Sequence, residues 1–163
     1  MYIELKQVFE IVGEQSTIDH TIDLSDYELY NSKPFITPII IHGKVSNKAG
    51  IVYFDYSTVF TMELSCDRCL SMFKREFSFS FERILVSNLN TDNDEYILVE
   101  DFKLDLDELV LSDILLNLPT KLLCKSDCKG LCVKCGINKN QNSCQCKETE
   151  IDPRLQILSQ LLK

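Results

Sequence analysis

The eight cysteines of this 163-residue chain fall in four close pairs. The pairs are a C-x2-C at Cys66 and Cys69, a C-x3-C at Cys124 and Cys128, a C-x2-C at Cys132 and Cys135, and a C-x-C at Cys144 and Cys146. A tetrahedral zinc site is commonly built from two such pairs, each of which supplies two thiolates. The pattern therefore predicts one or two zinc ions with a structural role.

The spacing alone leaves open which pairs share a metal ion. The preferred arrangement has site 1 at Cys66, Cys69, Cys124 and Cys128, and site 2 at Cys132, Cys135, Cys144 and Cys146. It requires the segment after Pro119 to fold back over the strand tip that carries Cys66. The alternative joins Cys124, Cys128, Cys132 and Cys135, and leaves the first and last pairs together. Site 2 is the weaker of the two, because a C-x-C is an unusual spacing for zinc.

The motifs argue against catalytic or redox chemistry. A catalytic zinc keeps an open position and uses His or carboxylate ligands, whereas His20 and His42 lie far from the cysteines in the sequence. A thioredoxin-type C-x2-C begins a helix, but strand patterns flank Cys66 and Cys69 on both sides. We find no phosphate-binding loop and no hydrolase or metalloprotease motif. We therefore expect a protein that is not an enzyme.

The start of the chain has no basic head followed by an apolar core, and no run of 18 apolar residues occurs. We therefore expect a cytoplasmic protein without a membrane partner, in a compartment where thiols stay reduced and bind metal in preference to forming disulfides.

Alternating apolar and polar residues predict the scaffold that holds these sites. A strand from Ile39 leads to a turn at 47–50, and the return strand places Val52, Phe54, Tyr56, Phe60, Met62 and Leu64 on one face. A third strand follows Cys69, with Phe73, Phe77, Phe79 and Phe81 on one face. Further short strands are expected within the first thirty residues and at 96–99.

Two capping signals predict helices. Asp105 and Glu108 form a capping box before a helix that ends by Pro119, and Asp152-Pro153 starts a short C-terminal helix. Leu89–Glu95 is predicted to be a loop. The predicted fold is α+β, mainly an antiparallel β meander or barrel-like sheet, with one central helix, a Cys-rich zinc-knuckle segment and the C-terminal helix. It forms a single domain, 1–163, with a zinc-binding subdomain at 120–148.

Charge is divided unevenly along the chain. The net charge is −8, which argues against nucleic-acid binding through bulk electrostatics. Residues 92–108 contain eight acids and one lysine, whereas 121–147 contain six lysines and one acid. The candidate residues for contact with a nucleic acid are accordingly Lys121, Lys125, Lys129, Lys134 and Lys139, with Arg68 near them if site 1 forms.

Three runs of residues together resemble the YceD family, the large ribosomal RNA subunit accumulation proteins, in its Gram-positive-like form. They are 64–70 around the first C-x2-C, 123–136 with Asn138 and the C-x-C, and 151–155 with Leu158. The resemblance covers nearly the whole chain and implies a role in synthesis, processing or stability of 23S ribosomal RNA. It also implies that Cys66 and Cys69 pair with Cys124 and Cys128, because some members keep only versions of these two pairs. The family usually has Pro where this chain has Val133.

Two classes of function follow. The first is a zinc-stabilised factor that acts on large-subunit ribosomal RNA or on an assembling ribosomal particle. The second is a protein-interaction adaptor, whose acidic stretch docks a ribosomal protein or processing enzyme without contacting RNA. A thiol switch is a third option.

Overall fold

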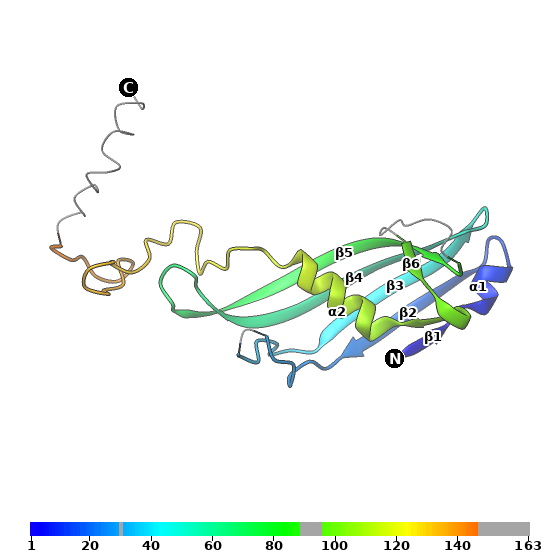
Figure 1. The fold of residues 1–163 in the computed structure, drawn as a ribbon, viewed down its shortest axis with the longest axis horizontal. Coiled ribbons are helices and arrows are strands. Elements are labelled where there is room, and N and C mark those ends of the chain that lie inside the picture. The colour runs from blue at the N-terminus through cyan, green and yellow to red at the C-terminus, as the bar shows by residue number, and fades with distance from the viewer. Residues whose placement is uncertain (30, 89–95, 147–163) are drawn as a thin grey trace, which may run out of the picture.

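The protein consists mostly of β structure, with few helices (Figure 1). This computed structural model describes residues 1–29, 31–88 and 96–146. Its elements are β1 (Tyr2–Glu4), α1 (Lys6–Glu10), β2 (Gln15–Ile22), β3 (Ile39–Lys48), β4 (Ile51–Ser65), β5 (Met72–Val86), β6 (Tyr96–Leu98), the 3-10 helix η1 (Glu100–Phe102), β7 (Lys103–Asp105) and α2 (Leu106–Asn117). The predicted loop at Leu89–Glu95 and the predicted helix from Asp152 lie outside the described residues.

The main sheet has five strands in the order β2-β3-β4-β5-β6, and its first four strands form the predicted antiparallel meander. The β3–β4 turn contains Ala49 and Gly50, both with positive φ (55° and 90°), as the tight turns of two-residue hairpins require. β3 pairs with β4 only as far as Val59, whereas β4 and β5 stay paired to Ser65 and Met72. The β4–β5 hairpin therefore extends past β3, and its tip carries the first cysteine pair.

Alternation along β4 and β5 forms the core. The β4 face predicted to be buried is buried at all six of its positions, and Thr58 joins them. Phe77 of β5 is buried, whereas Phe79 and Phe81 are only half-buried. The rings of Phe60, Phe77 and Phe79 contact one another at centroid separations of 5.7–6.0 Å. Because side chains alternate between the two faces of each strand, these rings lie on the same face and pack β4 against β5.

Three elements differ from the sequence-based expectation. The strand expected near residue 96 is β6, but it pairs with β5 in parallel, so the sheet is mixed and not wholly antiparallel. β1 pairs with β7 in a separate two-stranded sheet. The short helix α1 was not predicted, and the Asn47 side chain holds it by donating to the Val8 carbonyl oxygen at 2.8 Å.

α2 lies across the sheet (Figure 1). The side chain of Asp105 caps its first turn by accepting from the backbone N–H groups of Asp107 and Glu108. Leu106, Val110 and Ile114 are fully buried in the core.

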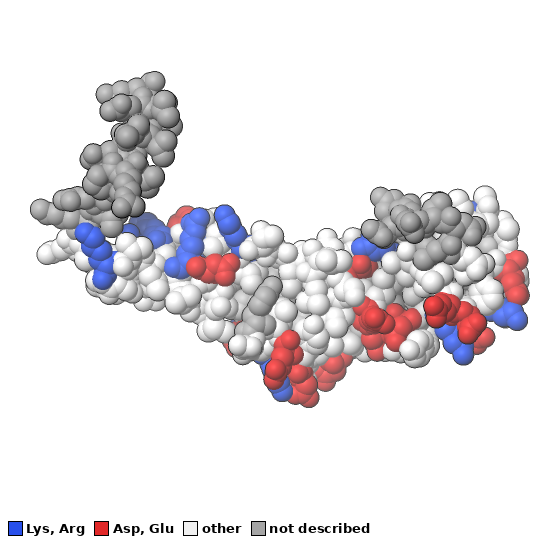
Figure 2. Space-filling model, in the orientation of Figure 1, with Lys and Arg blue, Asp and Glu red and all other residues white. Residues whose placement is uncertain are grey.

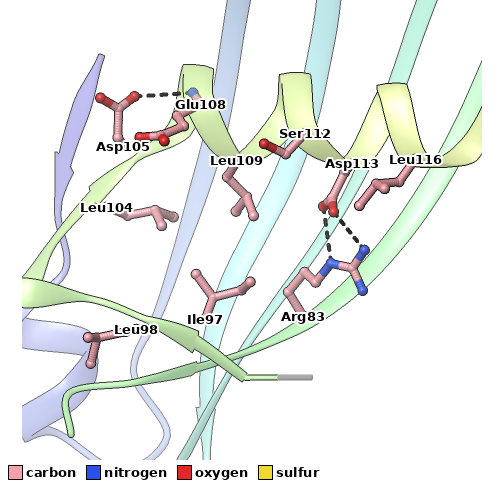
Figure 3. A pocket seen from close by; sticks show the side chains of 10 residues that line it. All are labelled: Arg83, Ile97, Leu98, Leu104, Asp105, Glu108, Leu109, Ser112, Asp113 and Leu116. Atoms are coloured by element: carbon pink, nitrogen blue, oxygen red, sulfur yellow. Dashed lines mark hydrogen bonds and ion pairs between the residues drawn. The ribbon is translucent and has the colours of Figure 1, made fainter. Parts of the chain in front are cut away.

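Asp113 of α2 is also buried, and its carboxylate accepts from Arg83 of β5 at 2.7 and 3.1 Å (Figure 3) and from the Tyr56 hydroxyl. Burial and the carboxylate raise the pKa of Tyr56 above its usual value, so the phenol stays a donor. This contact orients α2 on the sheet. Within the described part of the chain, no helix is long and apolar enough to cross a membrane.

The Asp113–Arg83 pair yields the first prediction. Asp113→Ala leaves a guanidinium and a phenol without their acceptor, so we expect the free energy of unfolding to fall by about 3 kcal/mol. Urea denaturation at neutral pH measures this loss. Glu108→Gln, at an exposed position of the same helix, is the matched control and should change stability by less than about 0.5 kcal/mol. Equal losses in the two variants would contradict the assignment.

Candidate metal centre

The tip of the β4–β5 hairpin places the first cysteine pair on one side of a tight turn. The Cys66 N–H donates to the Ser71 carbonyl at 3.0 Å, and the Leu70 N–H donates to the Cys66 carbonyl at 2.9 Å. Leu70 has a left-handed backbone (φ 57°) that closes this turn. Cys66 and Cys69 therefore lie on the same side of the turn and present their sulfurs together, as two ligands of one metal ion must.

The second pair reaches the tip because the chain after α2 folds back over it. The Asp67 N–H donates to the Leu122 carbonyl at 2.8 Å, and the Leu122 N–H donates to the Asp67 carboxylate at 2.6 Å. Arg75 of β5 donates to the Leu123 carbonyl at 3.0 Å. These bonds hold the residues just before Cys124 against the tip.

The four sulfurs of Cys66, Cys69, Cys124 and Cys128 lie within 4.8 Å of one another. The Cys66–Cys128 and Cys69–Cys124 Sγ separations are 3.8 and 3.7 Å. A zinc ion with Zn–S bonds near 2.3 Å in a tetrahedron requires sulfur–sulfur edges of about 3.8 Å. The donor set and these two separations thus fit zinc.

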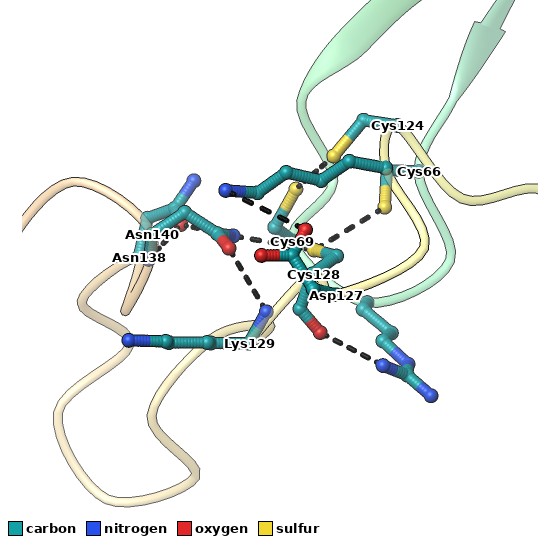
Figure 4. A network of polar contacts seen from close by, with 10 residues as sticks. Cys66, Cys69, Cys124, Asp127, Cys128, Lys129, Asn138 and Asn140 are labelled. Carbon is teal, nitrogen blue, oxygen red and sulfur yellow. Dashed lines mark hydrogen bonds and ion pairs between the residues drawn. The ribbon is translucent and has the colours of Figure 1, made fainter.

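Polar residues outside the four cysteines fix the position of Cys128 (Figure 4). The Arg68 guanidinium donates to the Cys128 carbonyl at 2.8 Å, and the Asn140 amide donates to the Cys128 sulfur at 3.2 Å. The Asn140 side chain is oriented in turn by the Lys129 N–H, which donates to its oxygen at 2.9 Å. Donors to a ligand sulfur orient that ligand and stabilise its negative charge.

The site 1 thiols have divergent proton affinities. Burial raises the pKa of Cys66, but backbone N–H groups, that of Cys124 first, outweigh it and lower this pKa to about 6. Burial and then the neighbouring Cys69 thiol raise the pKa of Cys124 to about 12. Four thiols this close resist full ionisation because their charges repel. A divalent cation removes that opposition, because metal ligands bind as thiolates.

Cys132, Cys135, Cys144 and Cys146 form the second group, also with all sulfurs within 4.8 Å. The Cys132 carbonyl accepts from the Gly136 N–H at 2.8 Å, and Gly136 has the positive φ (71°) expected after the second sulfur of a knuckle. N–H groups of Cys135 and Lys134 lower the pKa of Cys132 to about 6. The Cys135 thiol and then burial raise the pKa of Cys146 to about 12.

Gly130 connects the two groups. Its carbonyl accepts from the Lys139 N–H at 2.9 Å, while the next N–H, of Leu131, donates to the Arg68 carbonyl at 3.0 Å. Gly130 has φ +73°, and a Cβ here would lie 3.0 Å from the Arg68 carbonyl oxygen. Only glycine therefore allows the chain to pass this close to the hairpin tip.

The structure groups the cysteines as in the preferred arrangement, and not as in the alternative. The candidate lysines Lys121, Lys125, Lys129, Lys134 and Lys139 are all exposed around them. Arg68 lies beside site 1, but its guanidinium is already bonded to Cys128. His20 and His42 lie in β2 and β3, where they contact Asp107 and Asp19. The sequence motifs assign no role to Asn140 or Gly130, and the short C-K-G-L-C run is the signal that could have indicated the glycine.

Comparison with known proteins identifies relatives. The family model described as "Large ribosomal RNA subunit accumulation protein YceD" matches residues 54–162. The uncharacterized protein YlbN of Bacillus subtilis is 29% identical over 161 residues, covering 96% of this chain and 94% of that protein. The uncharacterized protein Rv2926c of Mycobacterium tuberculosis is 29% identical over 102 residues, covering 60% of this chain but 49% of that protein. No solved structure is significantly similar.

Gly130 and Gly136 form a matched pair for testing the close approach. Both have positive φ, but a Cβ at Gly136 would meet nothing within 4 Å. Gly136→Ala should lower the free energy of unfolding by about 1 kcal/mol through backbone strain alone. Gly130→Ala should lower it by at least about 1 kcal/mol more, because the added methyl also pushes the chain from Arg68. Denaturant titration of the metal-loaded variants measures both, and equal losses would refute the contact.

Zinc content tests the two groups separately. We expect elemental analysis to find two zinc equivalents in the purified chain, and one each in Cys128→Ser and Cys135→Ser. Cys128→Ser should also broaden the amide resonances of the hairpin tip, since site 1 joins the tip to the following segment, whereas Cys135→Ser should leave them sharp. Two equivalents retained in either variant would show that its cysteine is not a ligand.

Proposed function

The chain belongs to the YceD family of large ribosomal RNA subunit accumulation proteins, and on this premise we propose that it is a zinc-stabilised, non-enzymatic factor in ribosome biogenesis. It promotes synthesis, processing or stability of 23S ribosomal RNA by binding that RNA or an assembling particle. The observation that carries the proposal is the exposure of all five lysines around the cysteine groups. Its cellular site of action is the cytoplasm.

The role of zinc in this proposal is structural. Site 1 joins the hairpin tip to the segment after α2 and so fixes where Lys125 and Lys129 stand. Few large apolar side chains surround the site 1 sulfurs, with Phe73, Leu123 and Leu131 packed against them. A hydrophobic core this small contributes little, whereas structural zinc in small modules contributes on the order of 10 kcal/mol. The metal therefore replaces a core at this end of the molecule.

Charge in space supports contact with RNA at the same end. In Figure 2 Lys and Arg gather around the cysteine-rich end, whereas Asp and Glu predominate elsewhere on that face. Two zinc sites with four thiolates apiece would each add about −2. Most of that charge is carried by sulfurs with little or partial exposure, while the ammonium groups face solvent. Phosphates would thus meet the lysines first.

The hydrogen-bonded state of Asp113, a buried acid, favours a function without catalysis. Asp113 lines a cavity of about 420 Å³ beside α2, with Leu104, Leu109 and Leu116 (Figure 3). Its carboxylate is already bonded to Arg83 and Tyr56. A buried carboxylate whose oxygens already accept these hydrogen bonds anchors a helix and does not serve as a general base.

A second candidate function is the protein adaptor. It is favoured by the exposed acids near β1, η1 and α2, at the end of the molecule away from the cysteines. They are Glu4, Glu100, Asp101 and Glu108. A basic segment of a ribosomal protein or a processing enzyme is the complementary partner. The two functions place the contact at opposite ends of the molecule, so charge variants can separate them.

Salt-dependent gel shifts with 23S ribosomal RNA fragments test the proposal. We expect the wild-type affinity to fall steeply as salt is added, because lysines displace counterions from phosphates. Replacing Lys129, Lys134 and Lys139 by Gln should reduce the slope of log K against log[salt] by about 2, since each lost phosphate contact removes about 0.7 on a single strand.

The matched control replaces three exposed lysines outside the cysteine-rich segment by Gln: Lys44, Lys48 and Lys103. It should bind RNA like the wild type. No RNA binding at low salt by any form would reject the first candidate function. Loss of a protein partner on changing Glu100 and Glu108 to Gln would then support the adaptor.

A further inference from the structure

The two cysteine groups differ in their access to solvent. At site 1 Cys66, Cys69 and Cys128 are 0%, 5% and 2% exposed. At site 2 only Cys132 is buried, at 5%, whereas Cys135 and Cys146 are exposed. Val133, the apolar residue of the site 2 knuckle, is itself 86% exposed. Small solutes therefore reach site 2 sulfurs and are kept from most of site 1.

The two groups also differ in how the chain holds them. At site 1 backbone hydrogen bonds join the hairpin tip to the chain before and after its second cysteine pair, from Asp67 to Leu122 and from Leu131 to Arg68. At site 2 the Cys132 N–H donates to the Ile137 carbonyl at 2.8 Å, which holds the C-x2-C half. Within the described chain, no backbone hydrogen bond joins residues 143–146 to another segment. Among the described residues the backbone thus anchors the C-x2-C half, and a metal would add a link to the C-x-C half through its sulfurs.

We propose that site 2 is an oxidant-sensitive thiol site at which hydroperoxides convert Cys135 and Cys146 to a disulfide and release the metal, while site 1 keeps its metal. The inference rests on the zinc binding proposed above and goes beyond it. Both cysteines are exposed, and their sulfurs lie within the 4.8 Å group. Oxidation of a cysteine requires that the oxidant reach its sulfur, and exposure favours these two sulfurs over the buried ones of site 1.

The chemistry is balanced with the peroxide as oxidant. The Cys135 thiolate attacks the terminal oxygen of the hydroperoxide ROOH, so that a sulfur–oxygen bond forms, the O–O bond breaks, and the departing RO⁻ takes a proton to become ROH, which is water for hydrogen peroxide. The Cys146 thiolate then attacks the sulfenic sulfur, which forms the disulfide and expels hydroxide, protonated to water. Two thiolates lose two electrons, the peroxide gains them, and zinc leaves because two ligands are gone.

The consequence for the fold is local. The base of the knuckle stays closed. Leu131 and Asn138 form a β-bridge, and the Lys139 N–H still donates to the Gly130 carbonyl. The segment 143–146 loses its anchor, and Lys134, between the two knuckle cysteines, loses its fixed position. Oxidation therefore alters one part of the basic surface without opening the sheet or site 1.

Peroxide treatment of the zinc-loaded full chain tests the inference. Released zinc is followed with a chromogenic chelator, and disulfides are mapped by mass spectrometry of unreduced peptides. We expect one zinc equivalent to leave at least about tenfold faster than the other, because access controls thiolate oxidation. The first disulfide should join Cys135 and Cys146. In Cys146→Ser, which lacks the resolving thiol, dimedone should instead trap a sulfenic acid on Cys135.

Equal release of both equivalents, or a first disulfide that contains a site 1 cysteine, overturns the proposal. The disulfide map also separates this inference from the metal assignment. If the purified chain carries a single zinc, a first disulfide between Cys135 and Cys146 still supports the sensitive site, while the second zinc site is rejected. Resistance of Cys135 to peroxide that oxidises free cysteine rejects the sensitive site whatever the zinc content.

Discussion

The structure of the cysteine-rich end depends on the close packing of four thiols at the tip of the β4–β5 hairpin. Cys66 and Cys69 come from the β4–β5 tip, while Cys124 and Cys128 arrive from beyond α2, and their sulfurs sit 3.7–3.8 Å apart in pairs. Without a cation, ionising them places like charges in contact where burial already opposes charge. A bound divalent cation would offset this repulsion, because it attracts all four thiolates. Folding of the cysteine-rich end, ionisation of the four thiols and metal binding are therefore thermodynamically coupled.

Local patterns predicted the parts of the fold whose partners are adjacent in the sequence. The β3–β4 hairpin follows from a turn that needs positive φ and from strands that alternate on either side of it. The buried face of β4 follows from the same two-residue period, which leaves one register in which Phe54 and Phe60 are covered. The knuckles were equally local, since each C-x2-C turns back within about five residues. Only the grouping of the pairs needed a contact distant in sequence.

The elements that the sequence left undetermined depend on long-range contacts. β6 is three residues long, so its parallel alignment to β5 rests on pairing between Ile84 and Tyr96 and not on a pattern of its own. α1 has five residues and no side-chain cap, and a helix this short is formed by tertiary contacts such as the Asn47 amide. Asp113 falls in the helix predicted between Asp105 and Pro119, where no sequence pattern marks a partner for its carboxylate. Its burial became visible only with Arg83 and Tyr56 opposite it.

The position of the metal groups beyond the sheet explains how an acidic chain can present a basic surface. The described lysines around the cysteines are five against the single acid Asp127, and two thiolate-bound zinc ions would add about −4 in all, so the bulk charge there is close to zero. Long-range attraction is then weak, and contact distance decides the interaction, because charges beyond about 8–10 Å are screened at physiological salt. The sulfurs of site 1 lie inside while Lys125 and Lys129 point outward. In the proposed function, a surface organised in this way would distinguish a phosphate in contact from one nearby, and it would lose that distinction once the cation left.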